Sequence, residues 1–160
     1  MLKLRNADLF ETFEGLQNSF LVHCANCFHT MGAGVALEIR RRYPEAYRAD
    51  IQTERGNPLK LGAVSSAAIG SRRVFNLYGQ FSFGNGRDLD IFMLDKGLRL
   101  VAAEANAQNR AGIRTPIVTY KIGCGLAGGD WNEVVEILDN IAAEYNVEII
   151  VADKNLTIKE

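Results

Sequence analysis

Four side chains of types that often catalyse reactions or bind metals crowd into one short segment. His23, Cys24, Cys27 and His29 fall within seven residues. Zinc sites usually draw two ligands from one such cluster and two from a distant one, and no second cluster follows here. Cys24 and Cys27 also do not open a helix directly, as a thioredoxin-type redox pair would. We therefore expect no metal ion and no cofactor at this segment.

Two residues are the strongest catalytic candidates, and each has a structural alternative. His23 follows the apolar run Phe20–Val22, which is typical of a buried strand. A histidine near the end of such a strand is either a hydrogen-bonded core residue or a general acid–base group that faces a site. Asp130 precedes Glu133 by three residues, which is the pattern of a helix cap. A cap beside a ligand could also act on it.

Two glycine-rich segments have the composition of anion-binding loops. Gly32–Val35 separates a predicted strand from a helical pattern, and Gly123–Gly129 does so again later in the chain. Backbone N–H groups at such turns are unpaired and attract phosphates. The first segment lacks the third glycine of a dinucleotide fingerprint and the Lys and Ser/Thr of a Walker loop. We expect the loops to hold phosphates by backbone alone, unless these glycines only permit tight turns.

Three further candidates lie in predicted turns. Gln80 and Phe81 belong to a loop, residues 79–87, that combines glycines with aromatic residues, and such loops are more often functional than structural. Asn26 follows a predicted strand, where its amide can both donate to and accept from a ligand hydroxyl. Asp8 is either a solvated turn residue or an acceptor for a ligand amine.

The order of predicted elements is typical of one α/β domain. The predicted strands are residues 1–6, 20–24, 61–68, 73–78, 115–121 and 147–152. The predicted helices are residues 35–43, 47–57, 88–112 with Asp88 as the N-cap, and a segment from Asp130 that contains Val134, Ile137, Leu138 and Ile141. This alternation predicts a mostly parallel sheet covered on both faces. Ligands in such sheets bind at the carboxyl ends of the strands.

Composition narrows the partners and the compartment. The net charge of −1 gives no clustered basic excess, so nucleic acid is an unlikely partner. No apolar stretch has membrane-spanning length and no secretory signal is evident, so we expect a cytoplasmic protein with three reduced cysteines. We expect a domain over residues 1–152 and a polar tail over 153–160. The oligomeric state is not indicated, and a monomer is the simplest expectation.

Taken in order, these motifs resemble those of a macro domain. The resemblance implies a three-layer α/β/α fold with a mixed, mostly parallel sheet, and a site for ADP-ribose or a derivative. It implies that Asp8 binds the adenine amino group, that Asn26 binds the distal ribose, and that Gln80 and Phe81 flank that ribose. The implied pyrophosphate-binding residues are Gly32, Ala33, Gly34 and Val35 in one loop and Gly123, Cys124, Gly125, Leu126 and Ala127 in the other.

Within that family, residues 22–27 and 42–46 are most similar to the yeast-type ADP-ribose 1″-phosphate phosphatases. This similarity implies removal of the 1″-phosphate, with His23 as the acid–base or water-orienting group and Asp130 as its partner. ADP-ribosyl glycohydrolases of another subfamily use a lysine in the loop that includes Gln80 here and an aspartate at the place that Ala127 holds here, so this chain departs from that subfamily at both places. Glycohydrolysis, deacetylation of O-acetyl-ADP-ribose and non-catalytic reading of ADP-ribose remain the alternatives.

Overall fold

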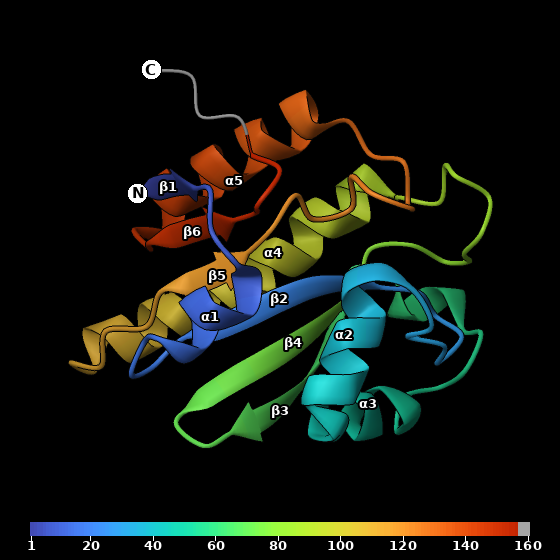
Figure 1. The fold of residues 1–160 in the computed structure, drawn as a ribbon, viewed down its shortest axis with the longest axis horizontal. Coiled ribbons are helices and arrows are strands. Elements are labelled where there is room, and N and C mark those ends of the chain that lie inside the picture. Colours follow the sequence, from blue (N-terminus) through green and yellow to red (C-terminus); the bar gives the residue numbers. More distant parts are fainter. Residues whose placement is uncertain (157–160) are drawn as a thin grey trace.

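A six-stranded sheet forms the centre of the structure, a computed structural model that describes residues 1–156 (Figure 1). The strands are β1 (Leu2–Arg5), β2 (Phe20–Ala25), β3 (Val64–Ile69), β4 (Arg72–Tyr78), β5 (Ile117–Thr119) and β6 (Ile149–Ala152). Their spatial order is β1-β6-β5-β2-β4-β3. Only β3 runs antiparallel to its neighbour, β4. The predicted mixed, mostly parallel sheet is therefore confirmed.

Helices cover both faces of this sheet, which gives three layers (Figure 1). One face carries α1 (Leu9–Glu14), α2 (Gly34–Arg42) and α3 (Pro44–Ile51), and the other carries α4 (Ile91–Arg110) and α5 (Trp131–Tyr145). A short 3-10 helix, Pro58–Lys60, follows α3. Within residues 1–156, no helix is long and apolar enough to cross a membrane.

Strand β2 lies in the middle of the sheet and is buried on both faces. Alternate residues of a strand point to opposite faces. Phe20 and Val22 join the core under α4 and α5, whereas Leu21 joins the core under α1 and α2. This two-sided burial explains why the strand is a continuous apolar run that could be recognised from sequence.

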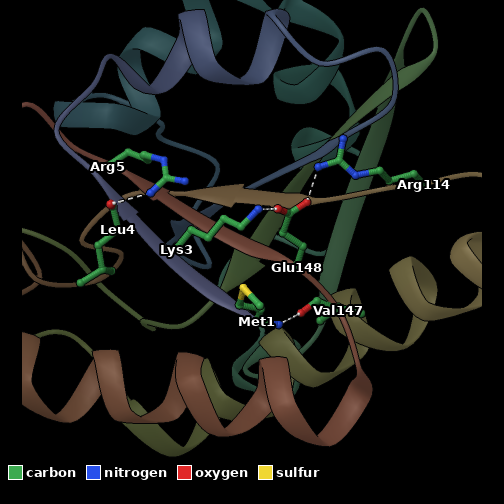
Figure 2. Close-up of polar contacts among 7 residues, drawn as sticks. All are labelled: Met1, Lys3, Leu4, Arg5, Arg114, Val147 and Glu148. Carbon is green, nitrogen blue, oxygen red and sulfur yellow. Dashed lines mark hydrogen bonds and ion pairs between the residues drawn. The ribbon is translucent and has the colours of Figure 1, made fainter.

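The edge strand β1 is tied to β6 by polar contacts as well as by its ladder (Figure 2). The amino group of Met1 donates to the Val147 carbonyl oxygen at 2.6 Å. Lys3 and Arg114 both pair with the Glu148 carboxylate (Figure 2). Burial alone would raise the pKa of Glu148, but hydrogen bonds from these two cations outweigh it and lower that pKa.

Two helices begin where the sequence predicted something else. The sequence analysis predicted no helix at the position of α1. In the structure, Asp8 caps this helix by accepting a hydrogen bond from the Glu11 N–H. Helix α3 begins at Pro44, upstream of the predicted start at residue 47, because proline is well suited to the first turn of a helix.

The N-cap of α4 is Asp90 and not Asp88. Asp90 accepts a hydrogen bond from the Met93 N–H, so the prediction for Asp88 is wrong. Asp88 instead accepts hydrogen bonds from the backbone N–H and side-chain amide of Asn85, which closes the preceding loop.

The predicted polar tail begins inside the packed domain. The Asp153 N–H donates to the Arg5 carbonyl at 3.1 Å, and the Asn6 side chain donates to the Leu156 carbonyl at 3.1 Å. Leu156 is only 3% exposed. Residues 153–156 are therefore held against β1, and residues 157–160 of the predicted tail lie outside the described residues.

Candidate functional site

A cavity of about 890 Å³ opens at the carboxyl ends of the central strands. Its wall includes Asp153 after β6, Tyr120 after β5, Asn26 after β2 and Gln80 after β4. These strands are neighbours in the sheet (Figure 1). The cavity therefore runs from β6 across β5 and β2 to β4. The size is typical of a site for a small ligand. The position is the one expected for open α/β sheets.

One wall of the cavity is the first loop, Gly32–Val35, which leads into α2. Ala33 is the N-cap of this helix, and among the described residues no side chain caps its N-terminus. The first N–H groups of a helix have no partner within it, and they carry the positive end of the helix dipole. Gly34 has φ +56°, a conformation that glycine adopts readily. This loop can therefore offer N–H donors to an anion.

The opposite wall is the second loop, Gly123–Ala127. The Gly129 N–H closes its base by donating to the Gly123 carbonyl at 2.8 Å. Leu126 is 71% exposed at its tip, and its Cδ1 would lie 3.7 Å from a Cβ built on Gly34. The two glycine loops thus face each other across the cavity, as the sequence predicted.

A third loop, residues 79–90, forms the rim between β4 and α4. Phe83, Gly84 and Gly86 line the cavity, and Phe83 is 51% exposed. The Leu89 N–H donates to the Ala127 carbonyl at 3.1 Å, which joins this loop to the second loop. Phe81 is not among the lining residues.

Phe81 and Asn26 help to hold the loops that surround the cavity. The Phe81 ring packs edge-on against Phe28 with 5.0 Å between centroids. The Asn26 side chain donates to Thr30 Oγ1 at 2.6 Å and accepts from the Phe28 N–H at 2.8 Å. Asn26 lines the cavity while it braces its own loop. Phe81 therefore supports the site from outside, and Asn26 forms part of it.

His23 lies outside the cavity wall. It is 0% exposed and pairs in register with Asn76 on β4, whose Oδ1 lies 2.6 Å from its Nε2. The Asn76 amide also donates to the Ala46 carbonyl of α3, so this pair occupies the face of the sheet under α3. Burial lowers the pKa of His23 to about 4, although the hydrogen bond with Asn76 acts in the opposite direction. The geometry matches the core interpretation of this residue.

Asp130 and Asp8 also lie outside the lining and act as helix caps. Asp130 is exposed, and its Oδ1 accepts from the Asn132 N–H at 2.9 Å at the start of α5. Asp8 caps α1 and has the Lys154 ammonium 3.8 Å away. The cap interpretation of Asp130 is confirmed. Apart from Asp8 and Phe81, all the predicted binding residues line the cavity: Asn26, Gly32, Ala33, Gly34, Val35, Gln80, Gly123, Cys124, Gly125, Leu126 and Ala127.

The cavity also contains residues that the sequence analysis did not single out. Tyr120, Lys121, Asp153 and Asn155 line the end near β6. Each follows a strand, so the rule that ligands bind at carboxyl ends could have found them. Asp50 of α3 also lines the cavity, and nothing in its sequence context indicates this position. It comes into the wall only through the packing of α3 on the sheet.

Two thiols belong to the wall and are held in the neutral form. Burial raises the pKa of Cys24 to about 12 and that of Cys124 to about 11. A thiolate is the reactive form of cysteine, so neither thiol is poised as a nucleophile at neutral pH. Within residues 1–156, no three His, Cys, Asp or Glu side chains are grouped closely enough to hold a metal ion.

Comparison with known proteins gives relatives along almost the whole chain. An uncharacterised 17.5 kDa protein of Enterobacteria phage T4 is 31% identical over 155 residues, which cover 94% of this chain and 96% of the phage protein. The macrodomain of Thermus aquaticus DarG has a similar fold, with a TM-score of 0.74 and 21% identity over 96% of this chain and 98% of that one.

A second similar structure was determined with a nucleotide ligand. Thermosipho africanus DarTG in complex with ADP-ribose matches with a TM-score of 0.70 and 17% identity, over 99% of this chain and 43% of the larger protein. The sequence pattern of the family described as Macro domain matches residues 22–138, which include most of β2, both glycine loops and the first half of α5. The chain belongs to the Macro domain family.

Proposed function

We propose that the cavity binds ADP-ribose or a closely related derivative. The observation that carries this proposal is the pair of glycine loops that face each other across one cavity. A diphosphate needs several hydrogen-bond donors at a short separation, and two loops of backbone N–H groups supply them without a cationic side chain. The ADP-ribose complex of Thermosipho africanus DarTG, which has the same fold, adds support.

In this proposal the ligand lies along the strand ends. The first and second loops hold the pyrophosphate. The adenosine occupies the end lined by Lys121, Asp153 and Asn155, and Asp8 stands beside that end through its contact with Lys154. The terminal ribose occupies the end lined by Asn26, Thr30 and Gln80. Amide and hydroxyl groups of this kind suit a sugar, because they can donate to and accept from its hydroxyls.

We propose hydrolysis of ADP-ribose 1″-phosphate to ADP-ribose and phosphate as the second candidate function. The similarity of residues 22–27 and 42–46 to the 1″-phosphate phosphatases favours it. His23 and Asp130 are not lining residues, so the proposal gives them structural roles. Catalysis would then rest on positioning and on N–H donors aimed at the phosphate oxygens.

Calorimetric titration with ADP-ribose tests the binding proposal. We expect saturable binding with a dissociation constant in the micromolar range, because several charge-assisted hydrogen bonds outweigh the entropic cost of association. Absence of binding at millimolar ADP-ribose would overturn the proposal. Release of inorganic phosphate from ADP-ribose 1″-phosphate, measured with EDTA present, tests the second candidate. Binding without release would leave a reader or a hydrolase of another ADP-ribose linkage.

A further inference from the structure

Asp50 presents a buried carboxyl group in the cavity wall. It is 1% exposed, and it lies near the carboxyl end of α3. The Tyr78 hydroxyl donates to its Oδ1 at 2.8 Å. Its Oδ2 has no hydrogen-bond partner within residues 1–156. A buried polar atom without a partner costs free energy, and in a cavity wall it indicates that a bound group supplies the missing hydrogen bond.

Oδ1, the oxygen of Asp50 that accepts the Tyr78 hydrogen bond, belongs to a continuous chain of hydrogen bonds inside the protein. From Asp50 the chain runs through Tyr78 to Ser65 at 2.8 Å, then to Asn76 at 3.0 Å and to His23 at 2.6 Å. We call these five residues the buried polar network. The network holds the side chain of Asp50 through Oδ1, so Oδ2 is the oxygen of this lining residue that has no partner within residues 1–156.

Within residues 1–156, no cationic side chain forms an ion pair with the Asp50 carboxyl group. Burial raises its pKa, while the Tyr78 hydrogen bond and the nearby His29 and Lys60 act in the opposite direction. The Lys60 ammonium is directed elsewhere, to the Cys27 carbonyl at 3.4 Å and over the Tyr78 ring. An asparagine could accept the same Tyr78 hydrogen bond without the cost of a buried charge. A carboxyl group that is buried despite this cost in free energy is characteristic of functional sites.

The chemistry of the surrounding wall indicates which ligand group meets Oδ2. Asn26, Thr30 and Gln80 line the same cavity and are neutral and polar, and Gln80 follows Tyr78, the partner of Asp50, by two residues. A phosphate would be repelled by a carboxylate, whereas a sugar hydroxyl can donate to it. We propose that Asp50 Oδ2 accepts a hydrogen bond from a hydroxyl of the terminal ribose, so that Asp50 determines specificity for ADP-ribose over ADP. This inference rests on the proposed binding of ADP-ribose.

Paired titrations with ADP-ribose and ADP test the role of Asp50, because ADP lacks the terminal ribose. For Asp50→Ala we expect the affinity for ADP-ribose to fall by about tenfold or more, since a charge-assisted hydrogen bond is lost. The affinity for ADP should stay within about twofold. The matched control is Asp130→Ala, which removes an exposed carboxylate outside the cavity and should preserve the ratio of the two affinities.

The outcomes separate the inference from the function on which it rests. If the unaltered protein binds neither ligand, the proposed function and the inference both fail. If it binds ADP-ribose but Asp50→Ala lowers both affinities equally, or neither, the inference alone is overturned. Should Asp50→Ala not fold, Asp50→Asn preserves the side-chain volume. Because it replaces the free acceptor by an amide, Asp50→Asn should lower the preference for ADP-ribose about threefold or more, and an unchanged preference would contradict the inference.

Discussion

The two glycine loops and the buried polar network meet at one cavity but are built in opposite ways. The loops are partly exposed and present backbone donors, so the identity of most of their side chains matters little. The network lies under α3 and consists of side chains from four elements, α3, β2, β3 and β4. The loops should therefore be sensitive to added bulk, and the network should be sensitive to pH and charge.

The largest effect on ligand binding should come from bulk at the base of the second loop. A Cβ at Gly128 would lie 1.9 Å from the Gly86 carbonyl oxygen, and this oxygen belongs to the backbone of the third loop. We expect Gly128→Ala to displace the loops and to weaken ADP-ribose binding by about 30-fold or more, which is roughly 2 kcal/mol. Calorimetry would measure this loss.

Gly112→Ala is the matched control for that experiment. Gly112 also has a positive φ, +89°, but a Cβ there would meet no atom within 4 Å among the described residues. Both variants carry the same kind of backbone strain, so the difference between them isolates the contact with Gly86. Equal binding by the two variants would mean that loop closure does not govern the site.

The next effect concerns pH and the network. His23 is neutral in the folded protein because burial lowers its pKa from 6.5 to about 4. The unfolded chain binds a proton below pH 6.5, so the contribution of His23 to stability is complete above that pH and is lost between pH 6.5 and about 4. The expected loss is about 3 kcal/mol in the free energy of unfolding. Urea denaturation across this range measures it.

His23→Gln separates this contribution from that of the other titrating groups. Glutamine can still bond to Asn76 but does not titrate. The stability difference between the unaltered protein and His23→Gln should therefore change between pH 6.5 and about 4 and be constant above this range. A difference that does not depend on pH would show that His23 is protonated equally in the folded and unfolded states.

A smaller effect is expected at the cap of α5. Asp130→Ala removes the acceptor for the Asn132 N–H and should lower stability by about 1 kcal/mol. ADP-ribose binding should not change, since Asp130 is not a lining residue. Thermal unfolding and calorimetry would measure the two quantities. A large loss of phosphate release with intact binding would return Asp130 to the list of catalytic residues.

The smallest effect should be a gain in stability at Asp50. Its pKa is raised in the folded protein, mainly by burial, so its contribution to stability is present at acid pH and is lost as the pH rises through the folded pKa. Asp50→Asn keeps the acceptor for Tyr78 and removes the buried charge. We expect a modest rise in the unfolding midpoint at pH 7 and none at acid pH. A lower midpoint at pH 7 would contradict this assignment.

The contrast between the regions also explains what the sequence could predict. The first and second loops are local motifs between a strand and a helix, so composition and spacing located them, and the structure places both at one cavity. The network joins residues that are up to 53 positions apart, and its Tyr78–Asp50 bond depends on how α3 packs. No local pattern records such a contact, so Asp50 was missed.

The side-chain candidates depend on tertiary packing more than the glycine loops do. His23, Asp130 and Asp8 were considered because their types can do chemistry, but each already has a hydrogen-bond partner in its own element or on the next strand. The sequence pattern located the strand that contains His23, but it did not indicate which side chain His23 contacts. Side-chain direction and partner are properties of the packed structure. Backbone loops do not need this information, which is why the sequence could predict that the two loops lie at one site.

The start of α5 contains an intrinsic fluorescence probe. Trp131 is the chain's single tryptophan, and it occupies the first position of this helix, a few residues beyond the second loop. Tryptophan fluorescence therefore comes from one position in the fold. That position adjoins the second loop, which we expect to become less mobile when a nucleotide binds. A stopped-flow fluorescence trace could follow the arrival and departure of ligand without any dye or label.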